Sequence, residues 1–177
     1  MNRARGRRSK SNGAQFEKLI EQACSVYARK NIAMIEKTPE PLRMVRAGRG
    51  NEVVAIFEKK AQPDFQGTLQ GGMSVVFEAK HTSSTNIQFD RITPVQSLYL
   101  AKHAKLGAEV YVIISFKFER FFFVPYNKWA KLQETLNKKS VNVNDLSEYE
   151  IDRTKGFLDF LGRREKYDEP QRHNAPH

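Results

Sequence analysis

Apolar residues recur at helical spacing near the start of the chain, and this stripe predicts the first element of the fold. The stripe consists of Phe16, Leu19, Ile20, Ala23 and Tyr27. These positions lie on one face of a helix, and Ser11 or Asn12 can cap its start, so we expect a helix that runs to about Lys30. Residues 1–10 are polar and show no apolar periodicity, which predicts a disordered basic tail.

β-Prone runs dominate the next part of the chain. Residues 32–35 form a short apolar run, and residues 53–57 are rich in valine, isoleucine and phenylalanine. The stretch 43–52 between them is basic and predicts an exposed excursion. Two further runs, 63–67 and 73–80, are separated by adjacent glycines. Two strands joined by a glycine-rich turn form a hairpin.

The second half of the chain alternates helix and strand signals. Thr93 can cap a helix that Pro94 opens, and this helix ends near Leu106, where Gly107 is a stop signal. Further elements are expected at 109–116 (a buried strand), 121–124 (its hairpin partner), 127–136 (a helix) and 157–161 (an apolar knot). This order predicts an α/β fold with a mixed central sheet flanked by helices.

Length and composition narrow the class of protein. A chain of 177 residues has room for one domain, which we place at 11–162, followed by a polar tail at 163–177. No apolar run approaches the roughly 20 residues of a membrane span, and no signal-peptide segment follows the basic N-terminus. The single cysteine, Cys24, excludes an internal disulfide and a cysteine-rich zinc site. We expect a soluble, cytoplasmic protein with no membrane partner.

The charge balance favours a phosphate-rich partner. Thirty Lys and Arg against 20 Asp and Glu give a net charge of +10. Several of the basic residues, Arg7 and Arg8 among them, lie in the first ten positions, which contain no acid. A field of this sign attracts nucleic acid backbones, and it attracts anionic membrane surfaces as well. Charge alone leaves both partners open.

Asp64, Glu78 and Lys80 form the strongest candidate site. With a turn near Gln70, the predicted hairpin brings Asp64 opposite residue 77 or 78, where opposed Cβ atoms lie about 4.5–5.5 Å apart. Two acids at that distance can share the divalent cation that phosphodiester hydrolysis needs. Lys80 projects to the same face as Glu78 because side chains alternate along a strand. The alternative is that these charges line a solvated face of the sheet.

The wider pattern resembles a known family of nucleases. Pro63-Asp64 followed by Glu78-x-Lys80 is similar to the PD-(D/E)xK signature of restriction-endonuclease-like nucleases. The surrounding residues resemble the RecU-type Holliday junction resolvases of Gram-positive bacteria and their phages. The resemblance covers about residues 11–136 and rests on Gly13, Glu17, 32–39, Asp64-Phe65-x-Gly67, Phe77-Glu78-Ala79-Lys80-His81-Thr82, Gln96 and 112–116.

The resemblance implies a restriction-endonuclease-like fold and a site that binds Mg²⁺, with Mn²⁺ able to substitute. Asp64, Glu78 and Gln96 would contact the metal. Lys80 would stabilise the transition state, and Glu17 would be a catalytic acid of the first helix near the site. Without the resemblance, the sequence predicts only that Glu17 and Gln96 are solvent-facing residues on helices.

The resemblance also implies a projecting basic stalk at about 44–60, in place of an ordinary flexible loop. Phosphate contacts position DNA without reading its sequence. The expected DNA-binding residues are Arg46, Arg49, Lys59 and Lys60 in the stalk, and Arg7 and Arg8 in the tail.

We therefore expect an endonuclease that makes paired nicks in four-way DNA junctions during recombination and repair. It would act as a homodimer, because a two-fold junction requires two sites related by two-fold symmetry. One alternative is a nuclease of the same fold that cuts duplex, flap or nicked DNA. The other is a non-catalytic DNA-binding accessory protein of recombination. Gln62 stands where the family commonly has threonine, so its role at the metal is open.

Overall fold

The computed structural model describes residues 2–39, 42–47, 53–57 and 62–162, with side chains for 6–39 and 62–162. The predicted C-terminal tail at 163–177 lies outside the described residues. The elements are α1 (Asn2–Arg29), β1 (Ala33–Lys37), β2 (Leu42–Ala47), β3 (Val53–Phe57), β4 (Phe65–Leu69), β5 (Ser74–Thr82), β6 (Asn86–Gln88), η1 (Phe89–Arg91), α2 (Pro94–Lys105), β7 (Glu109–Phe116), β8 (Arg120–Pro125), α3 (Tyr126–Leu136), β9 (Ser140–Asn142) and η2 (Ser147–Tyr149).

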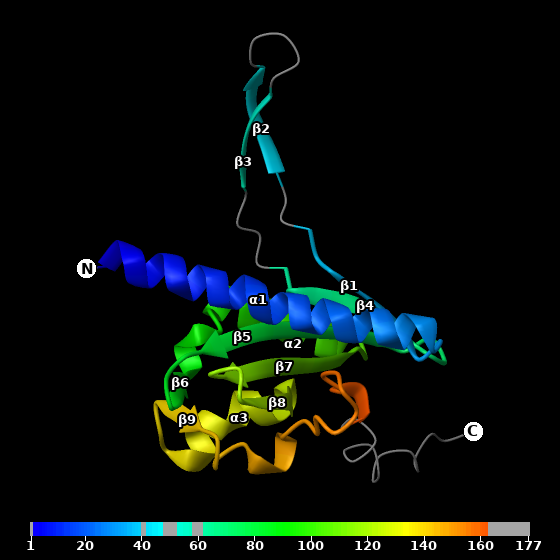
Figure 1. Ribbon diagram of the computed structural model, residues 1–177, viewed down its shortest axis with the longest axis vertical. Helices are drawn as coiled ribbons and strands as arrows, with labels where there is room; N and C mark the ends of the chain where they lie inside the picture. Colours follow the sequence, from blue (N-terminus) through cyan, green and yellow to red (C-terminus); the bar gives the residue numbers. More distant parts are fainter. Residues whose placement is uncertain (1, 40–41, 48–52, 58–61, 163–177) are drawn as a thin grey trace.

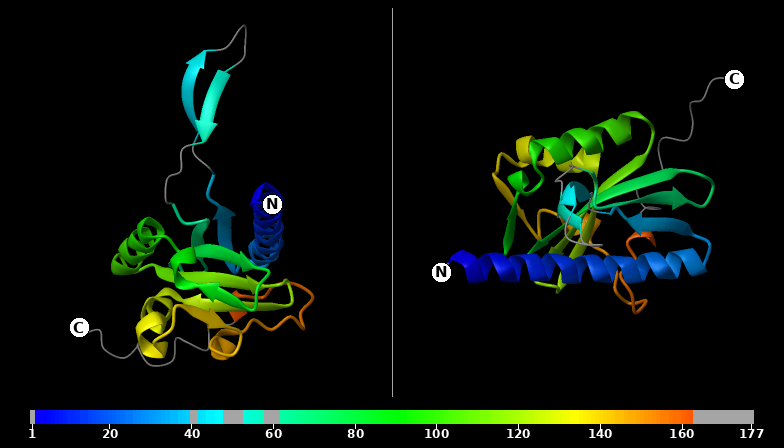
Figure 2. Two further views of the ribbon diagram at one scale, coloured as in Figure 1. Left: turned by 90° about the vertical axis from the view of Figure 1, so that its left-hand side faces the viewer. Right: turned by 90° about the horizontal axis from the view of Figure 1, so that it is seen from above.

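Five strands form the central sheet in the order β1-β4-β5-β7-β8. Strands β5 and β7 run parallel and the other neighbours run antiparallel, so the sheet is mixed. Helix α1 packs on one face, and α2 and α3 pack on the other (Figures 1 and 2). The predicted α/β class, with a mixed sheet flanked by helices, is confirmed.

Alternation along the strands divides the interior into two cores. In β5, Val75 and Phe77 face the core beneath α1, while Val76 faces the core beneath α2 and α3. Strand β7 is buried on both faces from Val110 to Phe116. A strand covered on both sides reads as a continuous apolar run, which is why its bounds match the sequence prediction.

The β4–β5 hairpin forms as predicted and lies in the middle of the sheet. Phe65 pairs with Phe77 and Gly67 pairs with Val75. A Cβ atom at Gly67 would lie 2.0 Å from the carbonyl oxygen of Met34 in β1. Only glycine therefore lets β1 approach β4 so closely, and this contact fixes the hairpin against the strand on its other side.

Strands β2 and β3 pair with each other as an antiparallel hairpin, with an irregular register between Met44 and Arg46. The hairpin projects away from the sheet and helices (Figure 1), so the predicted projection is confirmed. Arg46 lies in β2, although its side chain is outside the described part. The other proposed stalk contacts, Arg49, Lys59 and Lys60, lie outside the described residues.

The prediction of a disordered tail at 1–10 is wrong for residues 2–10, because α1 already begins at Asn2. Helix formation has a costly nucleus but propagates one residue at a time. The packed half of α1, anchored by Phe16, Ile20 and Tyr27, supplies that nucleus, and Arg, Lys and Ala are good helix formers. A prediction from composition treats the segment as an isolated peptide, so it leaves out the propagation of the helix from its packed half.

The sequence prediction also omits the two-stranded sheet of β6 and β9, whose paired segments are three residues long and largely polar. Only Ile87 and Val141 of this sheet are buried among apolar neighbours. So short an alternation does not stand out from a loop. Among the residues that the structure describes, no helix has both the length and the apolarity needed to span a bilayer.

Candidate active site

Asp64 and Glu78 meet at the open end of the β4–β5 hairpin. The register of β4 and β5 ends with the pair Phe65 and Phe77, so one further step sets Asp64 opposite Glu78, as the sequence predicted. The Asp64 Oδ2 atom accepts a hydrogen bond from the Ala79 amide at 2.8 Å. The Asp64 carbonyl accepts from the Thr38 amide, also at 2.8 Å. The aspartate is thus fixed between β5 and the end of β1.

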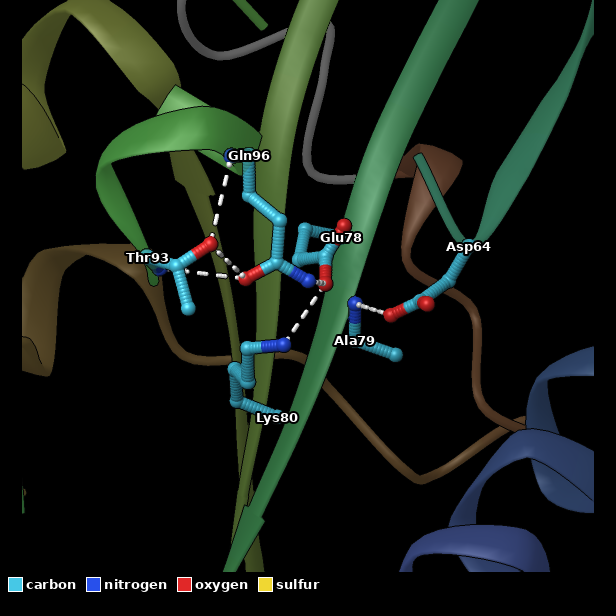
Figure 3. A network of polar contacts seen from close by, with 6 residues as sticks. All are labelled: Asp64, Glu78, Ala79, Lys80, Thr93 and Gln96. Carbon is cyan, nitrogen blue, oxygen red and sulfur yellow. Dashed lines mark hydrogen bonds and ion pairs between the residues drawn. The ribbon is translucent and has the colours of Figure 1, made fainter. Parts of the chain in front are cut away.

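Glu78 is completely buried, and its two carboxylate oxygens differ in their bonding. The Oε1 atom accepts hydrogen bonds from Lys80 Nζ at 2.6 Å and from Gln96 Nε2 (Figure 3). The Oε2 atom has no hydrogen-bond partner within the described residues. Burying a carboxylate oxygen without a hydrogen bond destabilises the fold. Stability therefore does not explain why this oxygen is buried.

The electrostatics of Glu78 agree with this geometry. Burial raises the pKa of Glu78 to about 7, and the nearby Asp64 carboxylate adds to the rise, while Lys80 opposes it. Lys80 shares the strand face of Glu78 and its side chain is only 14% exposed. One partly buried ammonium does not offset both burial and a second acid, so the site favours an additional positive charge.

Gln96 reaches this cluster from the first turn of α2 (Figure 3). Its backbone amide donates to the Thr93 hydroxyl, and its side-chain oxygen accepts from the Thr93 amide at 3.1 Å. Thr93 and Gln96 thereby form a capping box, which Thr-x-x-Gln before a helix predicts. The box fixes the side chain so that its amide nitrogen faces Glu78. Gln96 is therefore not the plain solvent-facing residue that its position alone suggested.

Glu17 does not join the cluster through any described hydrogen bond or ion pair. Its carboxylate instead lies 2.7 Å from Lys37 Nζ. Lys37 pairs with Phe65, the residue after Asp64, so the ion pair lies beside the site. A catalytic role for Glu17 stays a prediction. Arg7 and Arg8 are exposed on α1.

The residues present fit a divalent cation. No group of three or more His, Cys, Asp or Glu side chains gathers anywhere in the described part of the chain. The available oxygen donors are the Asp64 and Glu78 carboxylates, and the unpaired Glu78 Oε2 atom gives a cation a reason to bind there. Hard dications such as Mg²⁺ take carboxylate, amide and water oxygens. Gln96 could contribute its amide oxygen only by releasing the capping box.

Comparison with known proteins identifies the family. Residues 11–163 match the family described as RecU, recombination protein U, and the chain belongs to this family. The chain is 28% identical over 145 residues to the Holliday junction resolvase RecU of Staphylococcus aureus strain JH9 and to that of strain JH1, covering 76% of this chain and 69% of each relative. These findings confirm the resemblance seen in the sequence.

Solved structures are also similar to this chain. Among them is Hjc, a Holliday junction resolvase of the archaeal hyperthermophile Archaeoglobus fulgidus, with a TM-score of 0.47 and 17% identity. The match covers 76% of this chain and 92% of the Hjc chain.

Proposed function

We propose that this protein is a Holliday junction resolvase, a metal-dependent endonuclease that makes paired nicks in four-way DNA junctions during recombination and repair. Membership of the RecU family supports the proposal, as do relatives that carry the name of such resolvases. The observation that carries it is the completely buried Glu78, whose Oε2 atom is unpaired beside Asp64 and Lys80.

Asp64 and Glu78 would hold Mg²⁺, or Mn²⁺ in its place. A bound dication neutralises charge on the phosphate and lowers the pKa of bound water. Glu78 must be ionised to act as a ligand, and its raised pKa means that protons compete with the cation for this carboxylate. Gln96 holds the Glu78 carboxylate in position through its amide.

Lys80 would stabilise the negative charge that develops on the phosphate in the transition state. Its ammonium is held beside Glu78 at 2.6 Å and is largely withdrawn from solvent. A preorganised charge in a site with little water is more effective than one in bulk solvent. The protein therefore supplies a positively charged side chain of its own, in addition to the residues that would bind the metal.

The two-fold symmetry of a four-way junction supports a homodimer as the active form. Two strands have to be cut at related positions, which two identical sites achieve when a two-fold axis relates them. The β2–β3 stalk projects from the body (Figure 1), and a junction offers such a projection a central opening that a linear duplex lacks. We propose that the stalk supplies junction selectivity.

The direct test compares a synthetic four-way junction with a linear duplex of matched sequence, in Mg²⁺ and in EDTA. We expect symmetrical nicks in the junction with Mg²⁺ only, and no nicks with the Asp64→Asn protein. Equal cutting of junction and duplex would favour a general nuclease. No cutting, with tight binding that Lys80→Ala does not alter, would favour an accessory protein.

A second test concerns the stalk. Replacing residues 46–52 by a Gly-Ser turn leaves Asp64, Glu78 and Lys80 in place. The shortened protein should lose most of its preference for junction over duplex, measured as the ratio of the two dissociation constants at fixed salt. An unchanged ratio would show that the stalk does not contribute to junction selectivity.

A further inference from the structure

A polar groove lies between the N-terminal half of α1 and the loop that follows β5. Its volume is about 860 Å³. We name it the α1–β5 groove and define it by Arg8, Asn12, His81, Ser83 and Arg91, with Ser84 on its wall. In Figure 1 the N-terminal half of α1 extends past the end of β5, and Arg8 and Asn12 of this part of the helix line one side of the groove. The wall exists because residues 2–10 are helical.

Hydrogen bonds and a ring contact fix the shape of the groove. Asn12 of α1 donates to the Ser83 hydroxyl at 3.1 Å and lies 3.5 Å from the His81 ring. His81 in turn contacts the Ser115 hydroxyl at 3.1 Å and stacks on Phe118, with ring centroids 4.1 Å apart. These contacts fix α1 against the end of β5, so a ligand meets a preformed surface.

The lining selects an anionic, strongly hydrated ligand. Among the described residues that line the groove, Arg8 and Arg91 carry charge and none is acidic. Ile87 is the one apolar member of that set, whereas sites for small organic ligands are mainly apolar. Burial and the neighbouring Arg91 lower the pKa of His81, so the positive charge at neutral pH comes from the arginines. Guanidinium, amide and hydroxyl donors together suit phosphate oxygens.

The position of the groove relates it to the proposed active site. His81 follows Lys80 directly in β5, and Ser83 lies three residues beyond Lys80. At about 3.3 Å per strand residue this is roughly 10 Å along the chain. The groove therefore lies at the end of the strand that carries Glu78 and Lys80.

We propose that the α1–β5 groove binds the sugar-phosphate backbone of the DNA strand within a few nucleotides of the phosphate that is cut. Arg8 and Arg91 pair with phosphates, while the contacts of Asn12 with Ser83 and His81 hold the two sides of the groove together. This inference rests on the proposed function and adds a second DNA contact that is separate from the stalk. It also gives Arg8 a fixed site in place of a role in a flexible tether.

The first test is equilibrium binding to junction and duplex across a salt series, in a Glu78→Gln background that should not cut. The Arg8→Ala/Arg91→Ala variant should bind both DNAs at least about tenfold more weakly, and its slope of log K against log salt should fall by about 2, at roughly 0.9 per lost phosphate contact. The matched control is Lys128→Ala/Lys131→Ala, which removes the same charge from exposed positions of α3 outside the groove.

The second test maps the position of the DNA. Cys24 is buried, with its pKa raised to about 12 by burial, so a Ser84→Cys substitution can be labelled selectively with a photo-crosslinker. We expect crosslinks two to four nucleotides from the cut, and none near it from a Thr135→Cys control on α3. Equal affinity and salt slope for the two double variants, or crosslinks far from the cut, would overturn the proposal. A wild-type protein that binds junctions but never cuts them would refute the proposed function alone, because the binding test still judges the groove.

Discussion

Two buried carboxylates, Glu78 and Asp159, lie in the same domain and differ in how their oxygens are bonded. Asp159 Oδ1 accepts from the Tyr27 hydroxyl at 2.9 Å, and its Oδ2 accepts from Lys155 Nζ at 2.6 Å. Burial raises the pKa of Asp159, but the hydrogen bonds from Lys155 and Tyr27 outweigh burial and hold its pKa below the ordinary value. Glu78 has one oxygen with no hydrogen-bond partner among the residues that the structure describes, and its pKa is raised to about 7.

We propose that this difference separates a structural acid, Asp159, from a functional one, Glu78. Asp159 connects α1, through Tyr27, to the C-terminal segment that closes the first core, so stability accounts for it. Glu78 costs the metal-free protein stability at neutral pH, since folding disfavours its charge. Natural folds keep such unfavourable groups mainly where function requires them.

The largest expected effect is on cleavage when each acid is replaced by its amide. Glu78→Gln should abolish junction cleavage, a loss greater than the roughly 10–100-fold caused by removing an outer-shell partner of a metal site. Asp159→Asn should cut at nearly the wild-type rate below its melting temperature, because Asp159 lies outside the site. Single-turnover cleavage assays measure both. Similar losses from the two variants would make Glu78 a structural acid.

The lysines that pair with the two acids should differ in the same way; Lys80 pairs with Glu78, and Lys155 pairs with Asp159. Lys80→Ala should lower the single-turnover rate by on the order of 10²–10³, the usual cost of losing one preorganised charge-stabilising group, with little change in DNA affinity. Lys155→Ala should leave the rate unchanged, since Lys155 is largely exposed and contacts Asp159. A rate loss matched by an equal loss of affinity for Lys80→Ala would indicate a simple phosphate contact.

The pH dependence of metal binding should follow Glu78 and not Asp159. A cation requires the ionised Glu78 carboxylate, whose pKa is about 7, so affinity for Mn²⁺ should fall about tenfold for each pH unit below 7. It should change little between pH 8 and pH 9. Titration calorimetry at several pH values measures this. Constant affinity between pH 5 and pH 8 would contradict the raised pKa.

The smallest expected effect is on stability, and it has opposite signs at the two acids. Asp159→Asn removes charged hydrogen bonds and should cost about 1–3 kcal/mol, or about 2–4 °C in melting temperature per kcal/mol for a chain of this size. Glu78 holds its proton longer when folded, so the stability of metal-free wild type falls as pH rises from about 4.5 to about 7. Glu78→Gln removes this loss and should melt higher than wild type at pH 8 in EDTA.

Much of the fold could be predicted because its signals are local. The bounds of β7 follow from one unbroken apolar run, and the ends of α2 follow from Thr93, Pro94 and Gly107. The hairpin that brings Asp64 to Glu78 is also local, since a single turn determines its register. These elements needed no knowledge of distant contacts.

The features that the sequence did not predict depend on contacts between residues that are far apart along the chain. The bond between Gln96 and Glu78, and that between Tyr27 and Asp159, join residues 18 and 132 positions apart. The groove between Asn12 and Ser83 spans 71 positions and requires a helix where composition indicates disorder. Periodicity identified Glu78 as a residue on a strand, but only the assembled sheet shows that one of its oxygens is unpaired.

The central claim is that the fold keeps Glu78 to bind a cation. The most direct measurement is Mn²⁺ binding by titration calorimetry at pH 8, without DNA, for wild type, Glu78→Gln and Asp159→Asn. The account predicts that wild type and Asp159→Asn bind Mn²⁺ with the same affinity, and that Glu78→Gln shows no binding. Binding of Mn²⁺ to Glu78→Gln with the affinity of wild type would contradict the account.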